Sequence, residues 1–174
     1  AAMVAAASQA KAAASADPRQ VGYVDAISRK VSVRTPSGKT AGASVGDTFQ
    51  AGTTFSTGTD GRVVLKFADG QLVVLGPASI LGVDQYYFDP LDLKASKTAL
   101  YLVNGAMRYV SGAIHAENHE GVSIAAGASL VDILNTGLAD FTVVVNTKDQ
   151  EVGIAAVAAG EISVHTPYGP ISKI

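Results

Sequence analysis

Apolar and polar residues alternate along most of this chain, in short runs separated by glycine, proline, asparagine and aspartate. A period of two puts every second side chain on the same face of a β-strand, so these runs predict strands with one buried face. The clearest case lies within residues 45–79, where Asp60-Gly61 and Asp69-Gly70 are strong turn signals. Residues 62–67 and 71–75 are rich in β-branched and aromatic residues, which predicts two strands joined as a hairpin.

Further strands are predicted on both sides of this stretch. Residues 22–27 and 30–34 alternate and predict a first hairpin. A buried strand is expected at 99–103, then a turn at Asn104-Gly105, a strand at 106–114 and a polar loop at 115–120. Short strands follow, although the run 129–134 is too short for its period to exclude a helical turn: 122–124, 129–134, 140–146, 151–157 and 160–164.

Many short strands at even spacing predict an all-β fold, either a β-sandwich or a β-solenoid. Residues 31–38 and 162–169 match at most positions, and each contains a strand followed by a Thr-Pro-x-Gly turn. The match reflects either the common use of the same turn residues or a true repeat, which successive coils of a solenoid would explain. We expect one β domain over residues 21–174, preceded by an alanine-rich arm over residues 1–20.

The arm consists of small residues, and Lys11 is the one charged residue among positions 1–16. Three interpretations remain open: the tail of a signal peptide, a helix of about four turns, or an extended arm that adds a strand to the sheet edge of a neighbouring subunit. Asp17-Pro18 marks its boundary, because a residue before proline avoids helical backbone. If the arm joins subunits, the residues expected to make the contacts are Ala1, Met3, Val4, Ala7, Ala10 and Ala14.

Composition narrows the possible functions. Hydrophobic residues make up 48% of the chain and charged residues only 16%, against roughly 25% in an ordinary soluble domain. A surface with so few charges associates easily, and a formal net charge of -2 gives no basic patch for nucleic acid. The chain has no cysteine, which excludes disulfides and thiolate metal sites. No apolar run is long enough to predict a membrane-spanning helix.

Histidines provide the densest group of possible metal ligands. His115 and His119 are four residues apart and are accompanied by Glu117 and Glu120. This spacing allows a zinc or nickel site on the surface, but a solvated polar hairpin loop has the same composition. We therefore predict no metal site here.

A second group surrounds the aromatic residues 86–88. Asp84, Asp89 and Asp92 lack the spacing of a calcium loop, and we interpret them as turn caps. The aromatic residues are expected to pack and not to bind a sugar. The chain contains no nucleophile elbow, phosphate loop or dinucleotide fingerprint, so we predict no catalytic or cofactor-binding residue and no enzymatic activity.

Several of these turn residues together resemble the FecR domain family, over about residues 21–164. The resemblance depends on Gly46-Asp47, Thr57-Gly58, Asp60-Gly61, Phe67, Asp69-Gly70, Pro77-Ala78-Ser79, Tyr87-Phe88-Asp89-Pro90 and Gly105-Ala106-Met107-Arg108-Tyr109-Val110-Ser111-Gly112. Towards the C-terminus the match is partial. Residues 122–126 replace the Thr-Pro strand of the family and residues 135–141 replace its arginine-bearing G-x-R-G-T-D-F segment, whereas residues 157–164 fit its closing strand.

The resemblance implies an extracytoplasmic, β-rich, non-enzymatic module of the type that iron-transport regulators use to relay a receptor signal to an anti-sigma segment. No anti-sigma region or membrane helix is recognisable here, so the relay is not carried over. We expect a bacterial protein of the periplasm, cell surface or extracellular space, without cofactors, that forms a homo-oligomer or filament through its arm. The alternative is a monomeric module that binds another protein or a glycan.

Overall fold

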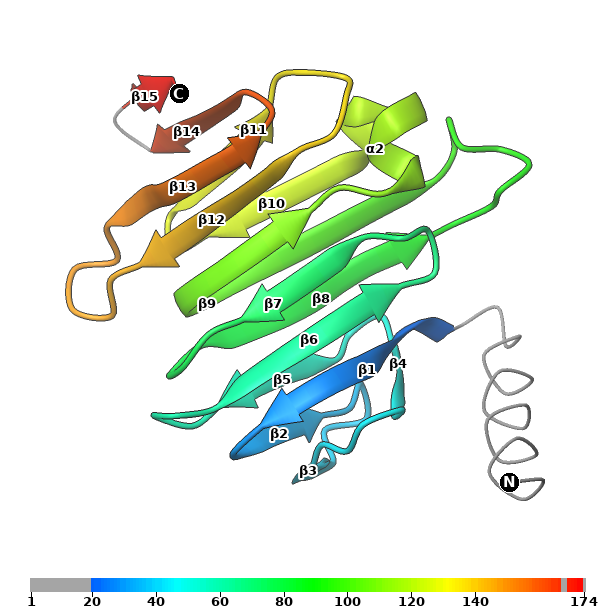
Figure 1. Cartoon of the computed structure of the whole chain (residues 1–174), viewed down its shortest axis with the longest axis vertical. Helices are drawn as coiled ribbons and strands as arrows, with labels where there is room; N and C mark the ends of the chain where they lie inside the picture. Colours follow the sequence, from blue (N-terminus) through cyan, green and yellow to red (C-terminus); the bar gives the residue numbers. More distant parts are fainter. Residues whose placement is uncertain (1–19, 167–168, 174) are drawn as a thin grey trace.

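The chain folds into two β-sheets packed face to face (Figure 1). The computed structural model describes residues 20–166 and 169–173. We name the sheets front and back after the view in Figure 1. The front sheet contains, in spatial order, β4 (Thr48–Gln50), β1 (Gln20–Ser28), β6 (Arg62–Phe67), β7 (Leu72–Leu75), the C-terminal half of β9 (Lys97–Val110), β12 (Asp140–Val145) and β13 (Val152–Ala159). The back sheet contains β3 (Thr40–Gly42), β2 (Val31–Arg34), β5 (Thr54–Thr57), β8 (Ile80–Tyr87), the N-terminal half of β9, β10 (Val122–Ala126), β11 (Ser129–Ile133), β14 (Ile162–Thr166) and β15 (Gly169–Lys173).

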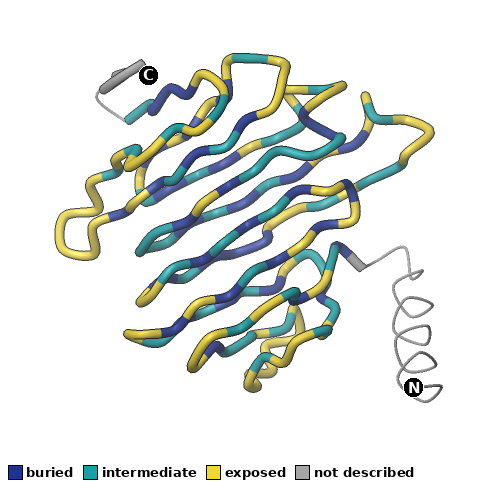
Figure 2. The backbone as a smooth tube through the Cα atoms, in the orientation of Figure 1, coloured by how far each residue is buried: buried dark blue, intermediate teal, exposed yellow. Residues whose placement is uncertain are grey.

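Burial alternates along these strands, as the sequence pattern predicts (Figure 2). The apolar side chains on the inner faces form one core between the sheets. Burying a side chain of this size contributes about 1.5–3 kcal/mol, so this core is the main source of stability. Its largest members, each less than 2% exposed, include Phe55, Leu65, Leu75, Leu81, Leu102, Met107, Tyr109, Ile124, Phe141 and Ile162. The all-β prediction is confirmed. Of the two predicted architectures, a β-sandwich and a β-solenoid, the chain adopts the sandwich.

Strand β9 belongs to both sheets. Its residues 97–104 pair with β8 and β10 in the back sheet, and residues 105–110 pair with β7 and β12 in the front sheet. Most neighbouring strands are antiparallel, whereas β9 and β10 are parallel. The predicted turn at Asn104-Gly105 is therefore wrong. Gly105, at φ +92°, redirects the strand from one sheet to the other without reversing it.

Two other predicted turns are corners between the sheets. The predicted hairpin of residues 22–27 and 30–34 is wrong, because β1 lies in the front sheet and β2 in the back sheet. Arg29, with φ 62°, makes the corner between them. Asp60-Gly61 likewise joins β5 of the back sheet to β6 of the front sheet. The predicted hairpin over Asp69-Gly70 is confirmed, since β6 and β7 are antiparallel neighbours.

The predicted polar loop over residues 115–120 is also wrong. A short helix, α2 (Ala113–Glu117), and a 3-10 turn, η1 (His119–Gly121), occupy this segment. The backbone N–H groups of Ala113 and Ile114 bond to Asp69, and the Ile114 side chain is fully buried. These contacts fix the start of a helix that is too short to show a helical period. Within the described ranges, no helix is long and apolar enough to cross a membrane.

The two matching sequence segments lie at opposite ends of the back sheet. Strands β2 and β14 each pair with the short strand that follows them, β3 and β15. The segments therefore have similar places in the fold, but five strands lie between β2 and β14 along the sheet (β5, β8, β9, β10 and β11), and they are not successive coils.

Residues 1–19 of the predicted arm lie outside the described residues, whereas Gln20 already belongs to β1, so the interpretation of the arm stays a prediction. This applies to all of its expected contact residues: Ala1, Met3, Val4, Ala7, Ala10 and Ala14.

Gly105 provides a test of the sheet crossing. A Cβ atom added at this position would lie 2.6 Å from the Cα of Ser79, and the positive φ adds strain. We expect Gly105→Ala to lower the free energy of unfolding by about 2 kcal/mol or more, measured by urea denaturation. The matched control is Gly153→Ala in β13, where an added Cβ meets nothing within 4 Å, and it should change stability by less than about 0.5 kcal/mol. Equal effects of the two substitutions would contradict the assigned crossing.

Candidate interaction site

The most connected polar group of the described chain is buried under the β6–β7 hairpin. Gln71, which is fully buried, donates from Nε2 to both carboxyl oxygens of Asp69, at 2.9 and 3.0 Å, and to Oγ1 of Thr98 at 2.8 Å. Tyr109 donates its hydroxyl to Oε1 of Gln71 at 2.6 Å, and Tyr86 donates to Oδ1 of Asp69 at 2.9 Å. We name these five residues the Asp69 cluster.

The Asp69 cluster has a structural role. Burial, and then the charge of Asp69, raises the pKa of both Tyr86 and Tyr109 well above the ordinary value. Both phenols therefore stay protonated and act as hydrogen-bond donors. The cluster joins β6 and β7 to β8, β9 and the start of α2, and Gly112 packs so closely that an added Cβ would lie 2.7 Å from the carbonyl oxygen of Asp69. Its polar groups satisfy one another and leave none directed at a ligand.

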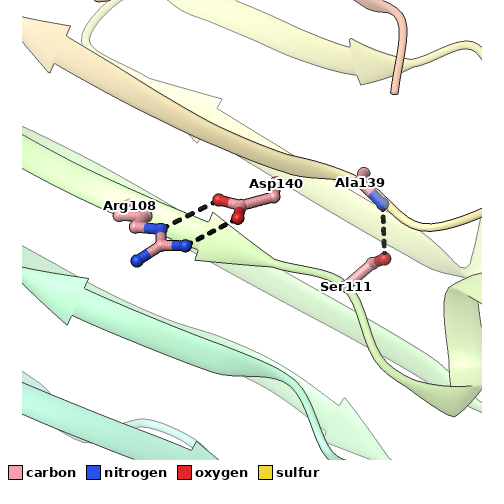
Figure 3. Close-up of polar contacts among 4 residues, drawn as sticks. All are labelled: Arg108, Ser111, Ala139 and Asp140. Carbon is pink, nitrogen blue, oxygen red and sulfur yellow. Dashed lines mark hydrogen bonds and ion pairs between the residues drawn. The ribbon is translucent and has the colours of Figure 1, made fainter. Parts of the chain in front are cut away.

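An exposed ion pair links β9 to β12 (Figure 3). Arg108 donates from Nε and Nη2 to the two carboxyl oxygens of Asp140, at 2.9 and 2.6 Å. Beside it, the N–H of Ala139 donates to Oγ of Ser111 at 2.8 Å. The hydrogen bonds from Arg108 are the main cause that lowers the pKa of Asp140. Asp140 belongs to the segment in which the family arginine is missing, and here an arginine from the neighbouring strand binds its carboxylate.

The two histidines of the predicted polar loop are in different environments. His115 is fully buried and His119 is exposed, so the expectation of a solvated loop is wrong for His115. Burial lowers the pKa of His115, and the nearby carbonyl groups of Asn135 and Gly137 only partly oppose that effect. Neither ring nitrogen makes a hydrogen bond of good geometry with the described residues. Within residues 20–166 and 169–173, no group of three or more His, Asp or Glu side chains is arranged to hold a metal ion.

The aspartates near the aromatic run behave largely as predicted. Oδ1 of Asp89 accepts from the N–H of Leu91, and Oδ1 of Asp92 accepts from the N–H of Ala95, which confirms both as turn caps. Asp84 lies exposed within β8 and not in a turn, so the turn-cap prediction is wrong for this residue. Tyr86 packs on Phe67 with ring centroids 5.7 Å apart, as expected for core packing.

A serine, a histidine and an aspartate meet on the back sheet without forming a catalytic triad. Nε2 of His165 lies 3.3 Å from Oγ of Ser163 and 2.9 Å from Oδ2 of Asp132. A triad needs the serine on one ring nitrogen and the carboxylate on the other, and here both use Nε2. Ser163 is also only 5% exposed. This arrangement is a surface hydrogen-bond network next to a shallow hollow of about 390 Å³ that includes Leu130 and Leu134.

Strand β13 is an exposed edge of the front sheet. It pairs only with β12 among the described strands, and none of its eight residues is charged. Two register shifts interrupt the pairing, and they leave Ala155 and Ala158 as extra residues in β13. Bulges of this kind bend an edge strand and make it a poor template for another strand.

The sandwich opens at its other end. Residues of β4 in the front sheet and of the β2–β3 hairpin in the back sheet line two neighbouring hollows there, of about 280 and 440 Å³. Val33, Thr35, Thr48 and Phe49 line both hollows. We name this feature the open-end groove.

Aromatic core residues form the floor of the groove. Phe49 and Phe55 pack edge to face with centroids 5.0 Å apart, and Phe49 contacts Phe67 in the same manner at 5.5 Å. Ala41 and Gly42 of β3 form part of the wall. The sequence alone does not identify these residues, because a groove between the ends of two sheets leaves no local pattern. The available signal was a large aromatic residue in each of two very short strands, Phe49 in β4 and Phe55 in β5.

Comparisons with known proteins bear on the family. Residues 53–163, more than half of the chain, match the family described as "FecR protein". The search of curated proteins gave no match. Among solved structures, a chain described as a "Cell surface anchoring domain" is 33% identical, over 35% of this chain and 80% of that chain, with a TM-score of 0.34. A score that low does not establish a shared fold.

The Asp69 cluster predicts the effect of one hydroxyl group. Tyr109→Phe keeps the ring but leaves Oε1 of the buried Gln71 without its 2.6 Å donor. We expect a loss of about 1–3 kcal/mol in the free energy of unfolding, measured by urea denaturation. The control Tyr87→Phe removes a hydroxyl from a side chain that is 50% exposed and should be nearly neutral. A neutral result for Tyr109→Phe would show that the cluster does not hold these strands together.

The Arg108–Asp140 pair predicts a pH effect. The pKa of Asp140 is lowered on folding, so its contribution to stability is present above the unfolded value of about 3.9 and is lost as the pH falls through the folded value. We expect Arg108→Gln to reduce stability modestly at pH 7, by at most about 1 kcal/mol for a largely exposed pair, and not at pH 2. Chemical unfolding at both pH values measures this difference. Arg29→Gln breaks a 3.9 Å pair with Asp60 on the open surface and should show no such dependence.

Proposed function

This chain belongs to the FecR protein family, and we propose that it is a non-enzymatic, exported assembly module whose copies join through the N-terminal arm. The observation that carries the proposal is the difference between the two ends of the sandwich. One end has a groove between its sheets, with core aromatic residues in its lining, whereas the edge strand at the other end is interrupted by bulges. An interface between two unlike surfaces is heterologous, and repeated use of it builds a ring or an open filament.

The low charge of the chain supports self-association. Only 16% of the residues are charged, and the arm contains a single charge among residues 1–16. Two surfaces of this composition can approach without desolvating many charged groups, which is the main electrostatic cost of forming an interface.

The absence of enzymatic activity is part of the proposal. The buried polar groups of the Asp69 cluster are engaged with one another, and Ser163, His165 and Asp132 share a single ring nitrogen. The exposed ion pair of Arg108 and Asp140 is likewise satisfied internally. These groups have structural roles, which supports a function in binding.

A second candidate function is a monomeric module of the periplasm or cell surface that recognises another protein or a glycan. The hollow beside η1 favours it, because Leu130 and Leu134 are 54% and 42% exposed there, next to the paired side chains of Asp132 and His165. An exposed apolar patch with polar neighbours is typical of a recognition surface. A chain that stays monomeric at high concentration would favour this candidate.

Light scattering coupled to size-exclusion chromatography tests the two candidates. We expect the full chain to form oligomers whose mass increases with concentration, and the variant lacking residues 1–16 to be monomeric. Circular dichroism of the variant should show the same β content, which separates loss of the arm from loss of the fold. Oligomers of unchanged size without residues 1–16 would contradict assembly through the arm.

A further inference from the structure

We infer that the open-end groove receives the N-terminal arm, residues 1–16, of a second copy of the chain. This inference rests on the proposed self-association and adds to it the receptor surface, its residues and the direction of assembly.

The groove has the shape of a site for an extended segment. Its two hollows share four lining residues, and both are lined by β4 and by the β2–β3 hairpin. Its floor consists of Val24, Phe49 and Phe55, which are 1%, 5% and 0% exposed and belong to the main core. An occupant would therefore extend the core itself and would not merely cover the surface.

The walls offer backbone as well as apolar side chains. Strand β3 is three residues long, is exposed along its whole length and pairs only with β2 among the described strands. An extended segment beside Ala41 and Gly42 can add a strand to this edge, with main-chain hydrogen bonds providing affinity and the apolar floor providing selectivity.

The position of the first residue of β1 points to the arm as the occupant. The first described residue, Gln20, pairs with Gln50 at the end of β4, and Gln50 lines the larger hollow. The segment that precedes β1 therefore joins the domain at the rim of the groove. Sixteen residues span about 50 Å when extended, more than enough to reach the groove of an adjacent copy.

The composition of the arm fits this groove. Alanine and serine side chains are small enough for a strand to enter a narrow space between two sheets, and Met3 and Val4 provide larger apolar groups for the aromatic floor. Charged residues are confined to the rim, where Asp47 lines the smaller hollow and Lys39 the larger one. A segment whose one charge is Lys11 can lie there without burying several unpaired charges.

The sequence at the arm boundary favours a second copy over the same chain. Pro18 restricts Asp17 to extended or turn backbone. To enter its own groove, the arm would have to reverse within residues 17–19, directly before β1 begins at Gln20. A second copy avoids this reversal, and docking of the arm on its own domain is an outcome of the test.

Disulfide trapping tests the inference, because the chain contains no cysteine. Two single variants, Ala10→Cys in the arm and Ala41→Cys in the groove wall, are mixed and oxidised. The experiment is repeated with Ala7→Cys and with Ala14→Cys in place of Ala10→Cys, because the register of the arm along the groove is not known in advance. A disulfide requires Cα atoms within about 7 Å, so only a docked arm is trapped. We expect a disulfide-linked heterodimer on a non-reducing gel. The matched control is Ala156→Cys in the β13 edge, which should give none.

The other outcomes separate this inference from the proposed function. Dimers formed with Ala156→Cys and not with Ala41→Cys would place the arm on β13, which overturns the inference and leaves assembly through the arm intact. An intrachain disulfide in the double variant Ala10→Cys/Ala41→Cys, with the protein monomeric, would overturn both. Assembly that persists with no cross-link from any arm position would also overturn the inference.

A second variant tests the groove without touching the arm. Ala41 pairs with Val33, so the two side chains lie on the same face of the back sheet, and both line the groove. Because Ala41 is exposed, Ala41→Leu should fold normally while filling the groove. We expect this variant to shift the light-scattering mass to that of a monomer at a concentration where the unmodified chain is oligomeric. Gly153→Leu in β13, where an added side chain meets open space, should assemble normally. Normal assembly of Ala41→Leu would contradict the inference.

Discussion

The buried hydrogen bonds of Asp69 and Gln71 are the constraint on which the rest of this fold depends. A carboxyl group and an amide inside an apolar sandwich destabilise it unless every polar atom has a partner, and the partners come from β8, β9 and the start of α2. The cluster thereby fixes the position of the β6–β7 hairpin of the front sheet relative to the back sheet. Nearby, Gly105 lets β9 pass from one sheet to the other.

A closed centre of this type directs function to the ends of the sandwich. The polar groups in the middle are satisfied internally, and the apolar side chains of both sheets share one core. At the open end a groove lies between the sheets, and the buried core residue Phe49 is part of its lining. At the other end, bulges in β13 protect the edge. A grooved end and a bulged edge on one molecule are the features on which the proposed directional assembly rests.

The sequence predicts the strands of this protein better than it predicts their connections. Alternation identifies β6, β7 and β11 because each has one buried face. It cannot show that Asp60-Gly61 is a corner while Asp69-Gly70 is a hairpin, since both dipeptides permit the same backbone and only the packing of the second sheet separates them. Helix α2 is missed because a contact with the distant Asp69 starts it. The family resemblance depends on these corner glycines and on Asp69 and Tyr109, which explains why it indicates architecture and not chemistry.

Hydrogen–deuterium exchange at several protein concentrations tests the central claim most directly, because it reports on each strand of the unmodified chain. If the arm of one copy occupies the groove of another, backbone amides in β3 and in residues 1–16 should become protected together as concentration rises, while β13 stays unchanged. Amides of β3 that exchange at the same rate in the monomer and in the oligomer would contradict the account, as would new protection confined to β13.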